Sequence, residues 1–424
     1  MARSIAENPF GERMRMNQEL LVYVHVPFCS SKCHFCYWTS PIPAAELVRN
    51  KAYSAQYRDA VLRQIRSVGT RGSLSSRPVR LIYFGGGTPS LLEVSDLEAI
   101  LSEIHDAFRF TDSFRDTTIE ISPETVDLER LRGLRAAGFT RISFGFQSLH
   151  PERLRKLGRA HSIGQALQAF ENGRAAGFDN INIDLMLGFP GETQEEFDES
   201  FQQTLALSPD HISLYIYRPV PNTVMARQID SGITVATPPE VAANRYLEAR
   251  KRLADMGYRE YIFQLFSKNG KRCFCDQSYF HVDVDHIGFG AGAHSLLNGK
   301  VMGHSPDLSS YLESPRFDYE FPASSAPNLI QAKLFEMLHT DDGINLARVQ
   351  ERFGMSFTDM LSRHEEIAAF YSDIREHGVD QDALGNLAFV DRDSRAMWLA
   401  NPPKQYKSSK VPMQASENLV QIHG

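Results

Sequence analysis

The stretch YVHVPFCSSKCHFCYW, residues 23–38, carries three cysteines, Cys29, Cys33 and Cys36, directly after a run of β-branched and aromatic residues. The C-x3-C-x2-C spacing places three soft thiolates on one short loop. Three thiolates can hold three irons of a four-iron, four-sulfur cube and leave the fourth iron open to another ligand. The stretch therefore predicts a strand followed by an iron–sulfur loop.

Zinc is the main alternative for these thiols, and unligated reduced thiols are another. A structural zinc site is closed by four ligands, and the candidates for a fourth are His25, His34, Cys273 and Cys275. A disulfide framework is not expected, because the chain has five cysteines, an odd number, in 424 residues. Cys273 and Cys275 receive no role: proton or hydrogen-atom transfer and inert packing both remain open for them.

Composition indicates an enzyme with a sizeable core and a small-molecule substrate. Hydrophobic residues make up 42% of the chain, and the net charge is −7 with no long basic run, which argues against a nucleic-acid partner. No run of 18 apolar residues is present, so no membrane span is expected. The chain opens with the polar MARSIAENPFGERMRMNQ rather than an apolar secretory segment, so we expect a cytoplasmic protein.

Short apolar runs alternate with segments of helical period along the first part of the chain. Strands are predicted at 21–27, 79–84, 117–122, 141–146, 181–187 and 211–217. Helices are predicted at 50–67, 94–108, 127–137, 163–176, 194–206 and 239–256. This order predicts an α/β fold, a partial (β/α)6 TIM-like barrel, followed by a small, mostly helical C-terminal domain.

Polar and glycine-rich motifs fall where these strands end. The turn at 85–89 follows the second strand, and Glu120, Gln147 and Asp184 lie at or near the ends of the next three. Functional groups of parallel barrels gather at the carboxyl ends of the strands. We therefore expect these residues and the cysteines on one rim.

Six motifs in this order resemble the radical S-adenosylmethionine enzymes, in the branch of oxygen-independent coproporphyrinogen III oxidase. They are the cysteine loop, GGGTPS (85–90), TIEISPE (118–124), FGFQS (144–148), LGRAHS (157–162) and INIDLMLGFPGET (181–193). The resemblance runs from about residue 21 to about residue 300. It implies that a [4Fe-4S] cluster on Cys29, Cys33 and Cys36 binds S-adenosylmethionine at its open iron and cleaves it to methionine and a 5′-deoxyadenosyl radical.

The resemblance also implies contacts to two S-adenosylmethionine molecules. The first would contact Tyr23, Phe35, Gly86, Gly87, Thr88, Glu120, Gln147, Arg159 and Asp184. Arg159 suits the carboxylate because a guanidinium binds it bidentately. The second would contact Met186, Tyr217, Arg218, Gln277 and His294, and Tyr23, Gln277 and His294 are the candidate catalytic residues. Taken singly, each has a structural alternative as a core, ion-pair or carbonyl-bonded side chain.

Two departures decide our interpretation within this branch. Tyr37, Trp38 and Thr39 follow the triplet, where the oxidases resemble C-x3-C-x2-C-x-C, and 275–280 reads CDQSYF, where the haem chaperones have His-Asn-x-x-Tyr-Trp. Both favour the class C methyltransferases, which would pass a methylene radical from the second S-adenosylmethionine to an sp2 carbon of a small natural product. Cyclopropanation is an alternative outcome, and the oxidase and the haem chaperone remain alternative functions.

The expected partners are a small-molecule substrate and an electron donor such as flavodoxin or ferredoxin, with a partner methyltransferase as a further option. We divide the chain into an N-terminal extension (1–20), the barrel with its extension (21–327), a winged-helix-like lid (328–400) and a disordered tail (401–424). Within the lid, helices are predicted near 332–340, 346–354 and 360–378, and a hairpin through 387–400.

Overall fold

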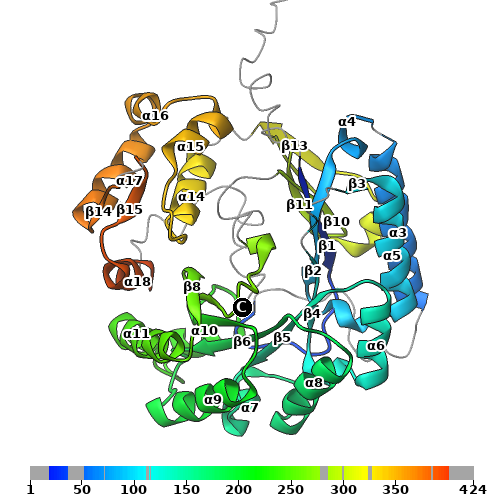
Figure 1. The fold of residues 1–424 in the computed structure, drawn as a ribbon, viewed down its shortest axis with the longest axis horizontal. Helices are drawn as coiled ribbons and strands as arrows, with labels where there is room; N and C mark the ends of the chain where they lie inside the picture. The colour runs from blue at the N-terminus through cyan, green and yellow to red at the C-terminus, as the bar shows by residue number, and fades with distance from the viewer. Residues whose placement is uncertain are drawn as a thin grey trace, which may run out of the picture.

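The computed structural model describes residues 19–36, 52–70, 72–110, 114, 116–276, 285–297, 300–322, 327–382 and 385–400. A 13-stranded sheet organises them, in the order β13-β12-β11-β10-β1-β2-β4-β5-β6-β7-β9-β8 with β3 beside β2. Its parallel strands are β10 (Asp285–Phe289), β1 (Leu20–Val26), β2 (Pro78–Gly86), β4 (Thr117–Ile121), β5 (Arg141–Gln147), β6 (Ile181–Leu187) and β7 (His211–Ile216). The strands curve around the centre of Figure 1, and helices lie outside them.

Short strands extend this parallel part. Beyond β7 lie the antiparallel β9 (Leu265–Ser267) and β8 (Arg259–Ile262), and beyond β10 lie the antiparallel β11 (His294–Leu297), β12 (Lys300–Gly303) and β13 (Tyr319–Pro322). The two-residue β3 (Arg109–Phe110) pairs with the start of β2.

The helices outside the barrel are amphipathic and follow the strands in turn. They are α3 (Ala52–Gly69), α4 (Gly72–Ser75), α5 (Val94–Ala107), α6 (Leu128–Ala136), α7 (Pro151–Leu157), α8 (Ile163–Ala175), α9 (Gln194–Leu207), α10 (Val224–Asp230), α11 (Pro239–Asp255) and α13 (Leu308–Glu313), with 3-10 turns η2 (Pro89–Leu91) and η3 (Pro123–Thr125). Capping boxes start α8 at Ser162 and α9 at Thr193, which satisfies the first backbone N–H groups of each helix.

The predicted α/β class and partial barrel are confirmed. Each of the six predicted strands agrees with an observed parallel strand to within two residues at either end. All seven residues of β1 and all seven of β6 are buried. A strand buried on both faces appears in the sequence as a run made mostly of apolar residues, which explains the agreement.

One parallel strand, β10, lies outside the predicted set, because its five residues DHIGF include two polar side chains and a glycine, and a tight turn follows it. Gly288 lies inside the strand, where a Cβ would come within 2.3 Å of the carbonyl oxygen of His294. The turn itself uses Gly290 and Gly292, whose φ angles are +107° and +83°. β10 pairs in parallel with β1 and so extends the barrel on the far side of the cysteine strand.

In the C-terminal part the predicted helix at 346–354 is confirmed, the one at 332–340 overlaps a helix that begins five residues earlier, and the one at 360–378 is divided into two helices. This part contains α14 (Pro327–Met337), α15 (Leu346–Phe353), α16 (Phe357–Arg363), α17 (Glu365–Glu376), β14 (Val379–Gln381), β15 (Leu387–Phe389) and α18 (Arg392–Ala400). The hairpin pairs β14 with β15, so the prediction of a hairpin through 387–400 is wrong. Asp391 accepts hydrogen bonds from the backbone N–H groups of Asp393 and Ser394, and this cap starts a helix instead.

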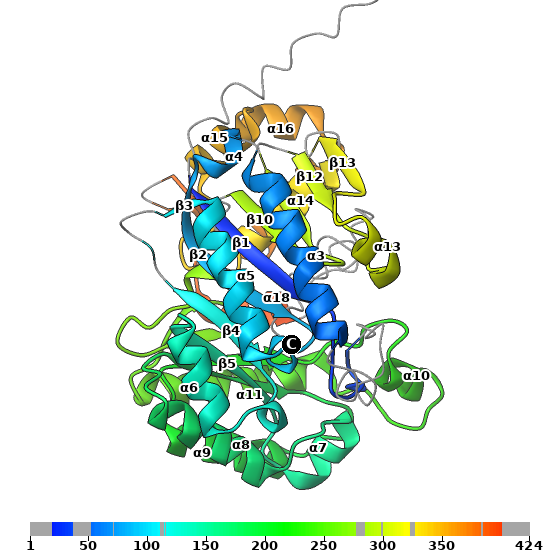
Figure 2. The ribbon, with the colours of Figure 1, turned by 90° about the vertical axis from the view of Figure 1, so that its right-hand side faces the viewer.

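These C-terminal helices share one hydrophobic core with β6, β7, α9 and α11. In Figure 1 they lie on the side of the barrel away from α3 and α5, and Figure 2 shows α10 projecting beside the dark-blue loop after β1. The predicted domain boundaries and the function of a lid stay predictions, and residues 1–18 and 401–424 lie outside the described residues.

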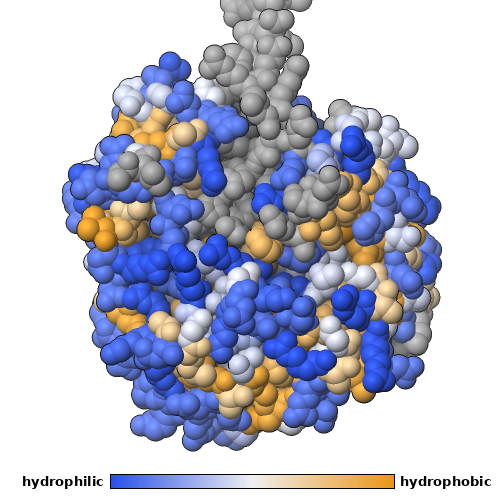
Figure 3. Space-filling view, viewed as in Figure 1, coloured by the Kyte–Doolittle hydropathy of each residue, from blue (hydrophilic) through white to orange (hydrophobic). Residues whose placement is uncertain are grey.

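The exterior shown in Figure 3 is largely hydrophilic, with scattered apolar residues. Among the helices that the structure describes, none is long and apolar enough to pass through a bilayer.

Candidate functional site

The cysteine loop follows β1 and is anchored to two other elements. The backbone N–H of His34 donates to the carbonyl of Leu157 at the end of α7 (2.8 Å), and the N–H of Met225 in α10 donates to the carbonyl of His34 (2.9 Å). Cys29, Cys33 and Cys36 are partly exposed and form no disulfide with any described cysteine, whereas Phe35 is buried. The loop is therefore held by both α7 and α10.

The three thiols interact electrostatically. Burial, followed by the proximity of Cys36 and Cys33, raises the pKa of Cys29 to about 12. Three thiolates here need a cation to share, which an iron–sulfur cube provides. Among the described residues, no three His, Cys, Asp or Glu side chains are grouped to hold one metal ion. In a [4Fe-4S] cube each thiolate binds a different iron atom, so the three thiols do not have to converge on one position.

Arg159 connects this loop to the end of β5. Its Nη1 donates to Cys33 Sγ at 3.1 Å, and its Nη2 donates to Ser122 Oγ at 3.1 Å and to the Gly145 carbonyl at 2.6 Å. Its position beside the cluster ligands agrees with the expected site. The guanidinium is engaged by these partners, so a ligand carboxylate would have to share it with them.

Glu124 and His161 also reach this loop, although the sequence analysis assigned them no role. Glu124 accepts hydrogen bonds from Ser30 and from Ser122 Oγ, and its carboxylate lies 3.6 Å from His161 Nδ1. Burial alone would raise the pKa of Glu124, but bonds from His161, Ser30 and Ser122 and the charge of Arg159 lower it to about 2. The signal was present, because both residues fall inside the TIEISPE and LGRAHS motifs.

The glycine turn packs directly against the cysteine strand. A Cβ on Gly87 would come within 2.4 Å of the Phe28 carbonyl oxygen, and one on Gly86 within 2.6 Å of the His25 ring. The N–H groups of Gly86, Gly87 and Thr88 donate to Glu120, Val26 and Phe28. A methionine moiety could accept hydrogen bonds from these N–H groups only if the present bonds to Glu120, Val26 and Phe28 were broken. In this structure the glycine turn therefore stabilises the cysteine loop.

The polar residues at the strand ends lie as predicted, on β4, β5 and β6. Glu120 accepts from Tyr83 Oη (2.9 Å) and from the Gly86 N–H (3.0 Å). Gln147 has a φ of +66°, and its buried Oε1 has no hydrogen-bond partner within the described part of the chain. Asp184 accepts from Asn182 Nδ2 at 2.7 Å. A buried amide oxygen without a partner suits a polar ligand.

Two residues of the predicted second site lie against the cysteine loop. Phe35, Leu157, Met186, Phe189, Tyr217 and Met225 form one apolar cluster, with Cys33 and Cys36 packed against it. The Phe189 ring centroid lies 5.9 Å from that of Phe35 and 5.0 Å from that of Tyr217. This apolar cluster joins Met186 and Tyr217 to the cluster loop.

Arg218 takes a different position from this apolar cluster. Its guanidinium donates to the carbonyl of Leu399 at the end of α18, and burial lowers its pKa to about 10. Gln277 lies outside the described residues. The predicted second-site set is therefore brought together only in part.

Tyr23, His25 and His294 lie along β1 and the start of β11. Tyr23 Oη is 3.0 Å from His25 Nδ1, and its ring stacks on Tyr83. Burial and then His294 lower the pKa of His25 to about 3, and burial lowers the pKa of His294 to about 4. Both imidazoles are therefore neutral at neutral pH.

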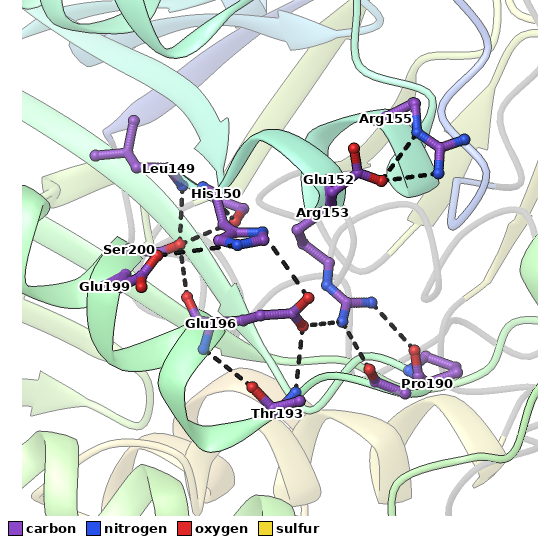
Figure 4. A network of polar contacts seen from close by, with 12 residues as sticks. Leu149, His150, Glu152, Arg153, Arg155, Pro190, Thr193, Glu196, Glu199 and Ser200 are labelled. Carbon is purple, nitrogen blue, oxygen red and sulfur yellow. Dashed lines mark hydrogen bonds and ion pairs between the residues drawn. The ribbon is translucent and has the colours of Figure 1, made fainter.

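The loop at 188–193 is fixed to α7, the helix that precedes Arg159. The buried Arg153 donates to the carbonyls of Pro190 (3.1 Å) and Gly191 (3.0 Å) and pairs with Glu196, as Figure 4 shows for Pro190 and Glu196. This network fixes α7 to the loop at 188–193. The helix itself is capped at its C-terminus by Gly158, which has a φ of +70° and directly precedes Arg159.

Comparison with known proteins agrees with the geometry. A model of the radical SAM superfamily matches residues 23–204. The heme chaperone HemW of Haemophilus influenzae is 32% identical over 283 residues, 66% of this chain and 70% of that protein. HemW of Bacillus subtilis is 27% identical over 343 residues, 80% of this chain and 88% of that protein. The structure of coproporphyrinogen III oxidase (HemN) from Escherichia coli is similar, with a TM-score of 0.73 at 22% identity over 92% of each chain.

These relatives overturn the class C methyltransferase interpretation, including cyclopropanation. Its basis was two short departures, after Cys36 and at 275–280, and an argument by elimination within the branch. Similarity to proteins named haem chaperones extends over 283 residues and carries more weight than either motif. The expected partners stay predictions.

The donor set fits the cofactors that the family implies. Three soft thiols suit a [4Fe-4S] cluster, and the orphan amide of Gln147 and the guanidinium of Arg159 suit the polar groups of S-adenosylmethionine. The chain belongs to the radical S-adenosylmethionine superfamily, in the branch that contains the haem chaperone HemW and the coproporphyrinogen III oxidase HemN.

Proposed function

We propose that this protein is a haem chaperone that carries a [4Fe-4S] cluster and S-adenosylmethionine. The observation that supports the proposal is the 32% identity to a HemW over 70% of that protein's length. The likeness to the oxidase HemN is at 22% identity and concerns the fold. The chain also has Trp38 where the oxidase pattern has its additional cysteine, which again favours the chaperone.

In this proposal Cys29, Cys33 and Cys36 hold the cluster, and Gln147, Arg159 and Asp184 orient the S-adenosylmethionine. When bound and reduced, the cluster supplies the electron that cleaves the sulfonium. The protein's own part is to hold the loop through His34, keep the thiolates paired with Arg159, and shield the site with the apolar cluster around Phe35. An electron donor such as flavodoxin or ferredoxin is proposed as a partner.

The apolar cluster around Phe35 is buried, with Phe189 0% and Tyr217 7% exposed, and it packs against Cys33 and Cys36 of the cysteine loop. We propose that its neighbouring aromatic rings and the thioethers of Met186 and Met225 support the haem-binding region from within. A second S-adenosylmethionine at Met186, Tyr217, Arg218, Gln277 and His294 stays a prediction, which counting bound cofactor per chain would test.

Haem titration of the anaerobically reconstituted protein tests the proposed function. We expect a Soret band that saturates at one haem per chain, with little 5′-deoxyadenosine formed. The Phe189→Ala variant should weaken haem binding, whereas Phe197→Ala, a core change away from the cysteine loop, should not. If haem does not bind and coproporphyrinogen III is consumed together with S-adenosylmethionine, the chaperone proposal fails and the protein is an oxidase.

A further inference from the structure

A series of buried hydrogen bonds connects Asp184, across the sheet, to the backbone at Cys273. Asn182 Nδ2 donates to Asp184 Oδ1 at 2.7 Å, and Asn182 Oδ1 is 2.6 Å from His211 Nδ1. His211 Nε2 is 2.7 Å from Tyr261 Oη, which accepts the backbone N–H of Cys273 at 2.9 Å. The series thus connects β6 and β7 to β8 and to the segment that follows β9.

The donor and the acceptor of each hydrogen bond in this series follow from the chemistry of the groups. The Asp184 carboxylate is met by the Asn182 NH2 group, so the carbonyl oxygen of Asn182 faces His211 and can only accept. His211 must then carry its proton on Nδ1, which leaves Nε2 to accept from the Tyr261 hydroxyl. Every donor points toward Asp184, so the orientation of one carboxylate sets the whole series.

Burial makes the series rigid. Asn182 is 1% exposed, His211 0%, Tyr261 4% and Cys273 0%, so water cannot replace a broken bond. Ser143 and Ser213 bond to Asn182 from the side and hold its amide in this orientation. Removing one member leaves its neighbours buried and unsatisfied, a cost that the fold avoids only while the series is complete.

The far end of the series lies on the inner side of the barrel. Cys273 and Cys275 pack with Tyr23 and Tyr83 in one buried cluster, and Tyr83 donates to Glu120. The backbone at Cys273 therefore sits beside a second group of residues assigned to the cofactor. No part of this connection was foreseen from the sequence: Asn182 lies in the motif at 181–193 but received no role, and His211 and Tyr261 lie outside the six motifs.

We propose that Asn182, His211 and Tyr261 are positioning residues that orient Asp184 toward S-adenosylmethionine and couple its binding to the backbone at Cys273. This inference rests on the proposed cofactor site at Asp184. Because coupling between two sites is reciprocal, occupancy at Asp184 stabilises the segment 271–276, and a fixed segment strengthens cofactor binding.

The test uses Tyr261→Phe in the full chain with its cluster reconstituted, and Tyr258→Phe as the matched control. Both tyrosines are buried, but Tyr258 donates to the carbonyl of Pro209 and lies outside the series. Two readouts are needed: the Kd for S-adenosylmethionine by equilibrium dialysis, and hydrogen exchange of the Cys273 amide with and without it.

In the wild type and in Tyr258→Phe, S-adenosylmethionine should slow exchange at Cys273. In Tyr261→Phe this slowing should disappear and the Kd should rise about fivefold, the effect of one hydrogen bond. If Tyr261→Phe is too unstable, Asn182→Ala with Thr204→Ala as control gives the same comparison, since Thr204 is equally buried but donates to the carbonyl of Ser200 in α9, outside the series.

The outcomes separate this inference from the proposed function. If S-adenosylmethionine does not bind the wild type, the proposed cofactor site itself fails. If it binds equally well to the wild type, Tyr258→Phe and Tyr261→Phe, with equal protection of Cys273, the cofactor site stands and the positioning role is refuted.

Discussion

Arg159 and Cys33 are joined by a hydrogen bond from the guanidinium Nη1 to the thiol Sγ, 3.1 Å long, between residues 126 positions apart. The same guanidinium donates to Ser122 and to the Gly145 carbonyl. One side chain thus ties a cluster ligand to the ends of two barrel strands, and its fixed fork of donors is what permits three bonds at once.

Arg159→Lys should therefore weaken the site although the charge is kept. An ammonium cannot reach all three acceptors, and each lost bond to a charged group contributes about 1.5–3 kcal/mol. We expect the free energy of unfolding to fall by about 2 kcal/mol, and iron bound per chain to fall with it. Urea unfolding and iron analysis would measure both.

Arg155→Lys is the control for this change. The Arg155 side chain is 71% exposed and pairs only at the surface with Glu152, so its replacement should leave both quantities unchanged. Equal effects of the two substitutions would show that Arg159 acts as an ordinary surface cation.

Glu124 should make stability depend on pH at the acid end. Its pKa is about 2 in the folded chain against an ordinary 4.5, so its contribution is complete above pH 4.5 and is lost as the pH falls toward 2. This lowering of the pKa of Glu124 corresponds to a contribution of about 3 kcal/mol to the free energy of unfolding. The free energy of unfolding of the wild type should exceed that of Glu124→Gln near neutral pH, and the difference should shrink below pH 4.5.

His25 acts in the same direction from a higher pH. Its pKa is lowered from 6.5 to about 3, so the unfolded chain takes up a proton that the folded chain refuses as the pH falls below 6.5. Because both proteins contain His25, the comparison with Glu124→Gln cancels this effect. A difference between them that stays constant down to about pH 3 would contradict the role of Glu124.

The sequence was sufficient for the barrel and for the positions of Cys29, Glu120 and Gln147 at its rim for one reason. Buried parallel strands are near-continuous apolar runs, and the residues at or just after the end of each run lie on the rim. The role of Cys29, Cys33 and Cys36 as cluster ligands stays a prediction. β10 could not be placed in this way, because the five residues DHIGF become a strand only through pairing with β1, far away in sequence.

The contacts that support the site were beyond the sequence for the same physical reason. Ser30 meets Glu124 across 94 positions, and Arg218 meets the Leu399 carbonyl across 181. No local pattern encodes such pairs. The class C methyltransferase interpretation was wrong because it depended on two short segments, the residues after Cys36 and residues 275–280. Such short segments do not measure how similar the rest of the chain is to each member of the family.

The close approach of the glycine turn to the cysteine strand predicts the effect of a single methyl group. In Gly87→Ala the new Cβ would lie 2.4 Å from the Phe28 carbonyl oxygen, backbone that cannot move without shifting the loop. We expect a loss of about 1–3 kcal/mol in the free energy of unfolding, together with poorer cluster loading. Thermal unfolding and the visible absorbance of the reconstituted protein would measure these.

Gly72→Ala is the matched change, because a Cβ on Gly72 meets nothing within 4 Å. It should leave both loading and stability near the wild type. If Gly87→Ala loads its cluster as well as Gly72→Ala does, the turn does not support the loop.

The attachment of α18 depends on a buried cation. Arg395, 4% exposed, lies 3.1 Å from Glu260 and 3.1 Å from Asp341, and Tyr246 donates to the same Glu260. Arg395→Ala would leave the buried Glu260 with the Tyr246 hydroxyl and the more distant Arg250, 3.9 Å away, so we expect a loss of about 3 kcal/mol in the free energy of unfolding. Because Leu399 at the other end of α18 receives the bond from Arg218, release of the helix should also expose that guanidinium. Limited proteolysis should then cut within residues 385–400 at a protease concentration that leaves the wild type intact.

Arg392→Ala is the matched control. The Arg392 side chain is 51% exposed and lies 2.7 Å from Asp341, so its loss should change the free energy of unfolding by less than about 1 kcal/mol. A protease pattern for Arg395→Ala that matches Arg392→Ala would mean that apolar contacts, not this ion pair, hold α18 against α11.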